Sequence, residues 1–380
     1  MIPYGKHNIN KSDILSVTQI LKNKFITQGK AVDKFENAIK KHVGAKYAVA
    51  VSSCSAGLHL AAQAFKIGKG KTLLTSPNTF CSTANAASHC RAEVDFIDIE
   101  KKTGNLSIKE LKKKLSEKKI HAVTAVHFGG LACEMKEIKK LSRRYNFVIF
   151  EDAAHALGSF YKNGSRVGSC KYSDLTVFSF HPVKSITTGE GGVITTNNFS
   201  IYKKLKILRS HGIEKNVKKK TNIKPWYYEM QELGNHYRIT DIQCALGLSQ
   251  LKRLNKFIKR RQVIAKKYDK TFSKLKNCFP LQYNLREKNS NHLYVLQINF
   301  KKIKKTRTTI INEFKKKGIG TQVHYIPVIS HPYYQSKRFN KKKFKNTFKY
   351  YEEALSIPIF YDLTPGDQNY VIKMVQKIIG

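Results

Sequence analysis

Apolar and polar positions follow two repeating patterns over about the first 200 residues. Short apolar runs occur at 47–53, 72–76, 92–99, 120–128 and 147–152, and two more occur at 174–180 and 191–197. Most of the stretches between them carry apolar residues at three- and four-residue spacing. The runs predict buried strands and the intervening stretches predict amphipathic helices. We therefore expect an α/β fold in which helices cover a mainly parallel, mixed sheet.

The pattern changes near residue 240. Residues 240–272 show continuous helical spacing, and an apolar run at 292–300, a helical stretch at 306–318 and a last helix near 366–378 follow. This order is typical of a small α+β domain. We predict a large domain at 1–250 and a small C-terminal domain at 251–380.

Composition favours a cytoplasmic protein. The chain has 380 residues, of which 41% are hydrophobic, and it contains no apolar run of the roughly 18 residues that a membrane span needs. The first residues, "MIPYGKHNINKSDILSV", lack the layout of a secretory signal. The chain has 7 cysteines and no Cys-x-x-Cys spacing. We therefore expect neither a disulfide framework nor a zinc site, and no membrane partner.

The net charge of +44 raises the alternative of a nucleic-acid-binding protein. The lysines are spread through "KELKKKLSEKK", "KNVKKKTNIK", "KKIKKTRTT" and "KRFNKKKFKN" instead of marking one compact module. Neither zinc-finger spacing nor an aromatic RNA-binding motif is present. We interpret these lysines as side chains on solvated helix faces, and we expect no specific nucleic-acid partner.

Polar residues gather where the predicted strands end. The turn "SSCSAG" after the first strand contains Ser53, Cys54 and Ser55, and Phe80 follows the second strand. Ligands bind beyond the carboxyl ends of the strands in open α/β sheets. A hydroxyl-rich turn that opens a helix also suits a phosphate group, although such a turn is more often only a helix cap.

Two later strand ends carry the reactive groups. Asp152 ends the strand at 147–152 and His155 follows it, while Ser179 lies at the end of the strand at 174–180 and Lys184 follows that strand. Each residue alone is ordinary, because a lone lysine is exposed by default. Together, a phosphate turn, a flat aromatic side chain, a carboxylate and a lysine are the parts that pyridoxal 5'-phosphate (PLP) requires.

The predicted roles follow from that chemistry. Lys184 would bond to the cofactor aldehyde and then move protons, for which it needs a partly neutral amine. Asp152 would pair with the ring nitrogen and keep it protonated. Around them we expect stacking by Phe80, phosphate binding by Ser179, Ser53 and Ser55, and a contact of His155 with the ring hydroxyl or the ring face.

The stretch "EDAAHALGS…GSCKYSDLTVFSFHPVKSITTGEGGVITTN" closely resembles the DegT/DnrJ/StrS family of PLP-dependent sugar aminotransferases. "SPNTFCSTANA", "RSHGI" and "RITDIQCALGLSQLKRL" extend the resemblance over nearly the whole chain. It implies a PLP-dependent transferase of fold type I and a homodimer with shared active sites. It assigns the covalent lysine to Lys184, the ring-nitrogen partner to Asp152, the phosphate serine to Ser179, the stacking ring to Phe80 and the ring neighbour to His155.

The resemblance also implies where the substrate binds. The segments "FITQGK" and "HYIPV" would border a nucleotide sugar, which places Thr27, Gln28, Gly29, His324 and Tyr325 at the substrate. Ser55 stands where the family usually has a phosphate-binding threonine.

One motif departs from the family pattern. The family usually has Gly-x-Asn-x-Arg before "TDIQ", and its Asn reaches the phosphate across the dimer. This chain reads "GNHYR", with His236 at that position, Asn235 one residue earlier and Arg238 matching. Either Asn235 or His236 could bind the phosphate.

The reaction implied by the resemblance is amino transfer from glutamate to C4 of a UDP-linked N-acetylated 4-keto-6-deoxy sugar of L-arabino configuration, as in pseudaminic acid synthesis. The D-xylo epimer and dTDP- or GDP-linked sugars remain alternatives. Family members that are dehydratases have histidine in place of the lysine, so Lys184 favours amino transfer. A non-catalytic regulator is a further alternative that the intact site disfavours.

Overall fold

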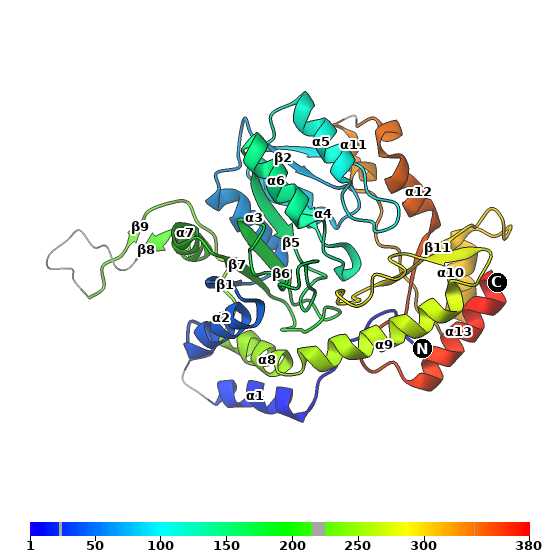
Figure 1. Cartoon of the computed structure of the whole chain (residues 1–380). Coiled ribbons are helices and arrows are strands. Elements are labelled where there is room, and N and C mark those ends of the chain that lie inside the picture. The colour runs from blue at the N-terminus through cyan, green and yellow to red at the C-terminus, as the bar shows by residue number, and fades with distance from the viewer. Residues whose placement is uncertain (23–24, 215–224, 338) are drawn as a thin grey trace.

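The computed structural model describes residues 1–22, 25–214, 225–337 and 339–380. Its central feature is a seven-stranded sheet in the order β1-β7-β6-β5-β4-β2-β3 (Figure 1). Only β7 runs antiparallel to its neighbours, so the predicted mainly parallel, mixed sheet is confirmed. The strands are β1 (Tyr47–Val51), β2 (Thr72–Thr75), β3 (Glu93–Phe96), β4 (Ala122–Val126), β5 (Val148–Asp152), β6 (Leu175–Ser179) and β7 (Gly192–Thr196).

Helices cover both faces of this sheet because side chains alternate along each strand. In β1, Ala48 and Ala50 join one apolar core, whereas Val49 and Val51 join the other. The first core is covered by α2 (Lys30–Val43), α5 (Ile108–Glu117), α6 (Met135–Tyr145) and α8 (Asp241–Leu251). The second is covered by α3 (Cys54–Ala64), α4 (Cys81–His89) and α7 (Phe199–Arg209). Helix α1 (Lys11–Leu21) lies against α8.

The long helix α9 (Leu254–Phe272) leads from the large sheet to a second, antiparallel sheet (Figure 1). That sheet contains β10 (Cys278–Pro280), β11 (Tyr294–Ile298) and β12 (Ala354–Ile357). It shares a third core with α9, α10 (Arg307–Lys316) and α13 (Pro365–Ile379). The expected late strand and last helix are therefore present, and the α/β fold followed by an α+β region is confirmed.

The segment between α10 and β12 returns to the large sheet. It contains α11 (Pro332–Gln335), α12 (Lys345–Glu353) and the short 3-10 helices η2 (Val328–Ser330) and η3 (Lys341–Phe344). Its apolar residues Val328, Ile329, Tyr334 and Phe344 join the core under α3 and α4. The division at residue 250 stays a prediction, since one core here draws on both sides of it.

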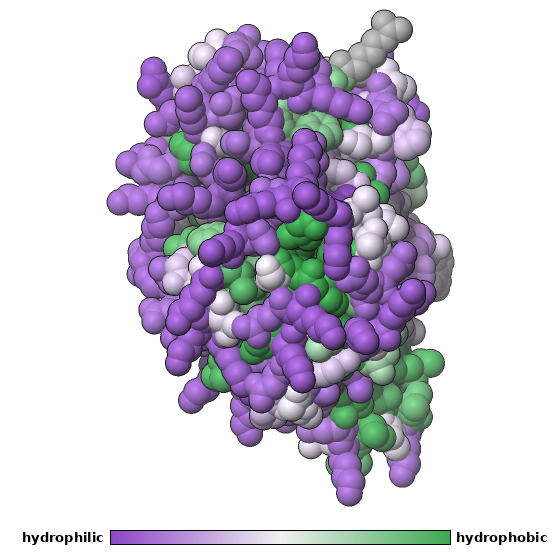
Figure 2. Space-filling model, turned by 90° about the vertical axis from the view of Figure 1, so that its right-hand side faces the viewer, coloured by the Kyte–Doolittle hydropathy of each residue, from purple (hydrophilic) through white to green (hydrophobic). Residues whose placement is uncertain are grey.

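A small arm extends away from the sheet (Figure 1), formed by β8 (Ile213–Glu214) and β9 (Glu229–Met230). The lysine-rich stretch "KNVKKKTNIK" at 215–224 lies outside the described residues. Figure 2 shows a largely hydrophilic face with apolar side chains grouped near its centre. Within the described ranges, no helix combines the length and apolar character needed to cross a bilayer.

Candidate active site

The predicted reactive residues meet at one edge of the large sheet. Strand β5 ends at Asp152, β6 ends at Ser179, and Ser53 follows β1. Because β7 is antiparallel, it begins at this same edge with Gly192. The connection from β6 to β7 therefore leaves and re-enters the edge, and it carries Lys184.

Asp152 is a buried carboxylate that is only 5% exposed. Its Oδ2 accepts a hydrogen bond from the Thr83 hydroxyl at 2.6 Å, and its Oδ1 accepts one from the Ala154 N–H at 3.1 Å. In the part of the chain that the structure describes, it forms no ion pair within 4.0 Å. A buried carboxylate without a bound cation is costly. The Asp152 carboxylate therefore fits a protonated ring nitrogen as its cationic partner.

Lys184 has the amine that the predicted chemistry needs. Burial lowers the pKa of Lys184 to about 8; Cys54 and Asp152 act to raise it, and the Arg261 charge lowers it further. The Cys54 thiol is no competing nucleophile, because burial raises its pKa well above the usual value. Near neutral pH, a useful fraction of the Lys184 amine is therefore uncharged and able to attack a carbonyl group or accept a proton.

The start of α3 is the place where the sequence predicts a cradle for a phosphate. Ser53 is the N-cap, and its Oγ accepts a hydrogen bond from the Ala56 N–H at 3.1 Å. The N–H groups of Cys54 and Ser55 belong to the first turn and have no partner inside the helix. They can therefore donate to an anion, which the helix dipole also favours.

Ser179 lies beside this cradle. It pairs with Gly192 in the β6–β7 ladder, and its Oγ accepts a hydrogen bond from the His181 N–H at 3.4 Å. A Cβ on Gly192 would lie 2.7 Å from the Ser53 carbonyl oxygen and 2.8 Å from the Cys54 nitrogen. The absence of a side chain at Gly192 lets the two strand ends approach.

His155 and Tyr325 line the same site. The Gly129 N–H donates to Nδ1 of His155 at 3.3 Å, and Nε2 of His155 lies 3.0 Å from the Tyr325 hydroxyl. Burial lowers the pKa of His155 well below its usual value, so the ring is neutral. A neutral ring that accepts at Nδ1 carries its proton on Nε2 and donates it to the Tyr325 oxygen. The Tyr325 hydroxyl can then donate its own proton to a ligand.

Phe80 and His324 flank Tyr325. The Phe80 ring is 60% exposed, and its centroid lies 6.1 Å from that of Tyr325. Nδ1 of His324 lies 2.8 Å from the Ser356 hydroxyl. Phe80 thus offers an open aromatic face, as stacking requires.

The other predicted residues lie elsewhere in the single chain. Thr27 pairs with Thr240, Gln28 has a φ of 58°, and the Gly29 N–H donates to Asp241 at the start of α8. Among the described residues, no hydrogen bond or ion pair connects the 27–29 segment to Lys184 or Asp152.

Asn235 and His236 also have local contacts. Nδ2 of Asn235 donates to Gln63 at 2.8 Å, and the His236 ring stacks on His211 at 5.2 Å. The nearby Nε of Arg238 is buried without a partner in the described ranges. Binding by Asn235 or His236 at the site of another subunit stays a prediction.

Three residues at the site were not predicted from the sequence. Thr83 holds Asp152, and a hydroxyl in the first turn of the helix after "SPNTF" could have indicated it. His292 has its ring 4.4 Å from that of His155, and the buried Arg261 donates to the His292 carbonyl oxygen at 3.2 Å. No strand-end pattern points to His292 or Arg261, because both come from the C-terminal third of the chain.

The fold and this edge define an aminotransferase of the PLP-dependent fold type I class. A family model matches residues 7–376, and the chain belongs to the DegT/DnrJ/EryC1/StrS aminotransferase family. This membership does not favour the nucleic-acid-binding alternative.

Known proteins resemble the chain over its whole length. It is 41% identical over 373 residues to the UDP-4-amino-4,6-dideoxy-N-acetyl-beta-L-altrosamine transaminase of Campylobacter jejuni subsp. jejuni serotype O:23/36, covering 98% of this chain and 96% of the relative. Helicobacter pylori PseC, an aminotransferase involved in the biosynthesis of pseudoaminic acid, superimposes with a TM-score of 0.92 at 30% identity, covering 100% of this chain and 99% of PseC. Spr1654 from Streptococcus pneumoniae, in a PLP form, gives a TM-score of 0.89 at 26% identity and covers 100% of both chains.

Proposed function

We propose that this enzyme uses PLP to transfer an amino group from glutamate to C4 of a UDP-linked N-acetylated 4-keto-6-deoxy sugar. The observation that carries the proposal is Lys184, whose amine has a pKa of about 8 and lies at the same strand-end edge as Asp152. The choice of substrate rests on the similarity to the Campylobacter transaminase, which is 41% identical over almost the whole chain. The L-arabino keto-sugar is our first choice, and the D-xylo epimer or a dTDP-linked sugar is the alternative.

The residues at this edge of the large sheet would have separate roles in the reaction. Lys184 holds the cofactor covalently between turnovers and, once released, moves the proton at the reacting carbon. Asp152, fixed by Thr83, would keep the ring nitrogen protonated. When bound, PLP supplies the aldehyde that accepts the amino group and the ring that draws electrons from the reacting carbon.

Other side chains would hold the ligands in place. The Cys54 and Ser55 N–H groups and the Ser179 hydroxyl face the phosphate, and Phe80 stacks on the ring. The Tyr325 hydroxyl, which receives the proton of His155, donates to an oxygen of the cofactor or of the sugar.

Product analysis tests the reaction. Purified enzyme is incubated with glutamate and, in separate reactions, the L-arabino and D-xylo UDP keto-sugars and a dTDP keto-sugar. Mass spectrometry and NMR should show amination at C4 of the L-arabino UDP sugar, with no product from Lys184→Ala. Amination at C3, or amination of the dTDP sugar alone, would contradict the proposed substrate.

A further inference from the structure

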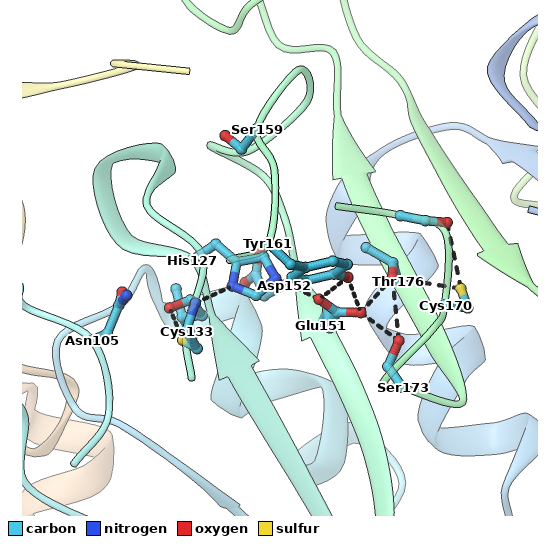
Figure 3. A network of polar contacts seen from close by, with 12 residues as sticks. Asn105, His127, Cys133, Glu151, Asp152, Ser159, Tyr161, Cys170, Ser173 and Thr176 are labelled. Carbon is cyan, nitrogen blue, oxygen red and sulfur yellow. Dashed lines mark hydrogen bonds and ion pairs between the residues drawn. The ribbon is translucent and has the colours of Figure 1, made fainter. Parts of the chain in front are cut away.

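A second buried carboxylate lies next to Asp152 on β5. Glu151 is fully buried, and because side chains alternate along a strand it points to the opposite face of the sheet from Asp152. Figure 3 shows polar side chains converging on Glu151 from several segments. The reaction proposed above assigns no role to this residue.

The Glu151 carboxylate accepts hydrogen bonds from four side chains. Nε2 of His127 lies 2.6 Å from Oε2, and the Tyr161 hydroxyl lies 2.8 and 2.7 Å from the two carboxylate oxygens. The Thr176 hydroxyl donates to Oε1 at 2.9 Å, and the Ser173 hydroxyl donates to the same atom. We call Glu151 with these four donors the Glu151 hub.

The carboxylate at the centre of the Glu151 hub is ionised. The Cys133 N–H donates to Nδ1 of His127 at 3.1 Å, so Nε2 carries the ring proton that His127 donates to Glu151. Burial acts to raise the pKa of Glu151, but the hydrogen bond and electrostatic interaction with His127, followed by the hydrogen bonds from Ser173 and Tyr161, outweigh it and hold the pKa below its usual value. Glu151 is therefore an ionised carboxylate that its four donors stabilise.

The Glu151 hub connects the ends of β4 and β5 to the start of β6, at the point where Asp152 leaves the sheet. His127 directly follows β4, and its backbone N–H donates to the Asp152 carbonyl oxygen at 3.1 Å. Thr176 on β6 is the register partner of Glu151. On the far side, the Ala153 N–H donates to the Val177 carbonyl oxygen at 2.8 Å. The Asp152 backbone is therefore held from both neighbouring strands.

We propose that Glu151 is a positioning residue, and that the Glu151 hub fixes the direction of the Asp152 carboxylate toward the ring nitrogen of the cofactor. The inference rests on the proposed function. An ionised carboxylate can accept from all four donors at once, whereas a glutamine would turn an NH2 group toward some of them. The charge of Glu151, and not only its shape, therefore sets the geometry of the strand end.

Glu151→Gln in the PLP-loaded enzyme tests the proposal. A displaced Asp152 holds the ring-nitrogen proton less well, and loss of that positive charge raises the pKa of the lysine nitrogen bonded to the cofactor. The pH midpoint of the visible cofactor absorption should therefore shift upward, in the direction that Asp152→Asn shifts it. We expect kcat to fall about 10-fold or more, because small misplacements of catalytic groups lower the rate by such factors. The KM for the nucleotide sugar should stay nearly unchanged.

Tyr268→Phe is the matched control. It removes one buried tyrosine hydroxyl, which donates to the Pro358 carbonyl oxygen at 3.0 Å in the core of the small sheet. It should lower the melting temperature and leave the absorption midpoint unchanged. If Glu151→Gln does not fold, Glu151→Asp replaces it, because it keeps the charge but withdraws it from the donors.

The outcomes separate the two proposals. A folded Glu151 variant with the wild-type midpoint and kcat overturns the positioning role, even if it melts earlier, and leaves the proposed function standing. A wild-type protein that shows no visible cofactor band overturns the proposed function and this inference with it.

Discussion

Lys184 is one of 70 lysine and arginine residues, and its surroundings make it different. Most basic side chains of this chain extend into water, where an amine keeps its proton at neutral pH. Lys184 lies instead on a connection between two buried strands, beside Asp152 and Arg261. Burial lowers its pKa to about 8, which suits the catalytic role that we propose for it.

The capture of PLP by cofactor-free enzyme should therefore depend on pH. Only the neutral amine attacks the aldehyde, so the rate should rise with pH and level off above a midpoint near 8, well below the 10.5 of an ordinary lysine. Stopped-flow absorbance measures the rate, and Lys184→Ala should form no borohydride-reducible adduct. A midpoint above pH 10 would contradict the burial of this amine.

The residues of the site that belong to local motifs could be predicted from the sequence. Lys184, Asp152 and Ser179 follow apolar strands, and the carboxyl ends of parallel strands share one edge, so the pattern alone implies that they meet. His292, just before β11, and Arg261, on α9, reach the same site through tertiary packing. Nothing in their neighbouring residues distinguishes them from core residues, and only the fold reveals them.

At the scale of elements, the strands were predicted from their apolar runs to within a few residues. Three features could not be predicted that way. The direction of β7 depends on its partners and not on its own pattern, and the return of 328–344 to the core under α3 depends on contacts across the whole chain. The close approach of β7 to the start of α3 is a third such feature.

Gly192→Ala tests this approach. Its Cβ would lie 2.7 Å from the Ser53 carbonyl oxygen, which is backbone and cannot move without disturbing the first turn of α3. We expect a loss of about 1–3 kcal/mol in the free energy of unfolding and weaker binding of PLP, measured by denaturant titration and by cofactor release.

Gly366→Ala in α13 is the control for this substitution. There the nearest atom to a new Cβ is the Thr364 hydroxyl oxygen at 3.8 Å, an ordinary contact. Stability should stay the same or rise, because alanine favours helix. Equal losses in the two variants would show that the close approach at Gly192 has no special importance.

At the scale of the whole molecule, three buried histidines make stability depend on pH. Burial lowers the pKa values of His155, His292 and His324, the last to about 3. The unfolded chain therefore binds more protons than the folded protein below about pH 6.5, and stability present above that pH is lost as the pH falls. His324 alone should cost about 2 kcal/mol between pH 7 and pH 5.

Thermal melts between pH 7 and pH 5 measure this loss. The melting temperature should fall steeply for the wild type and less steeply for His324→Gln, which has no group to protonate. Parallel curves for the two proteins would show that His324 titrates normally in the folded state.

The expected homodimer can be tested by mixing subunits. The phosphate contact that the family resemblance implies for Asn235 or His236 would reach the site of a second subunit. Exchange between Lys184→Ala and an Asn235/His236 double variant should restore about one intact site per heterodimer. Activity that stays at the level of the separate variants after subunit exchange would argue against shared sites.

The pairing of β1 with β7 has a consequence for how the protein is made. Val51 pairs with Gly192 and Tyr47 pairs with Thr196. Strand β1 therefore cannot form this pairing until β7 has been translated. Pairing between segments so far apart in sequence is slow and leaves the earlier strand exposed on the nascent chain. The turn that follows β1 cannot take its final place until Thr196 has left the ribosome. We therefore expect the turn that would hold the cofactor phosphate to form late, after the central region has been translated.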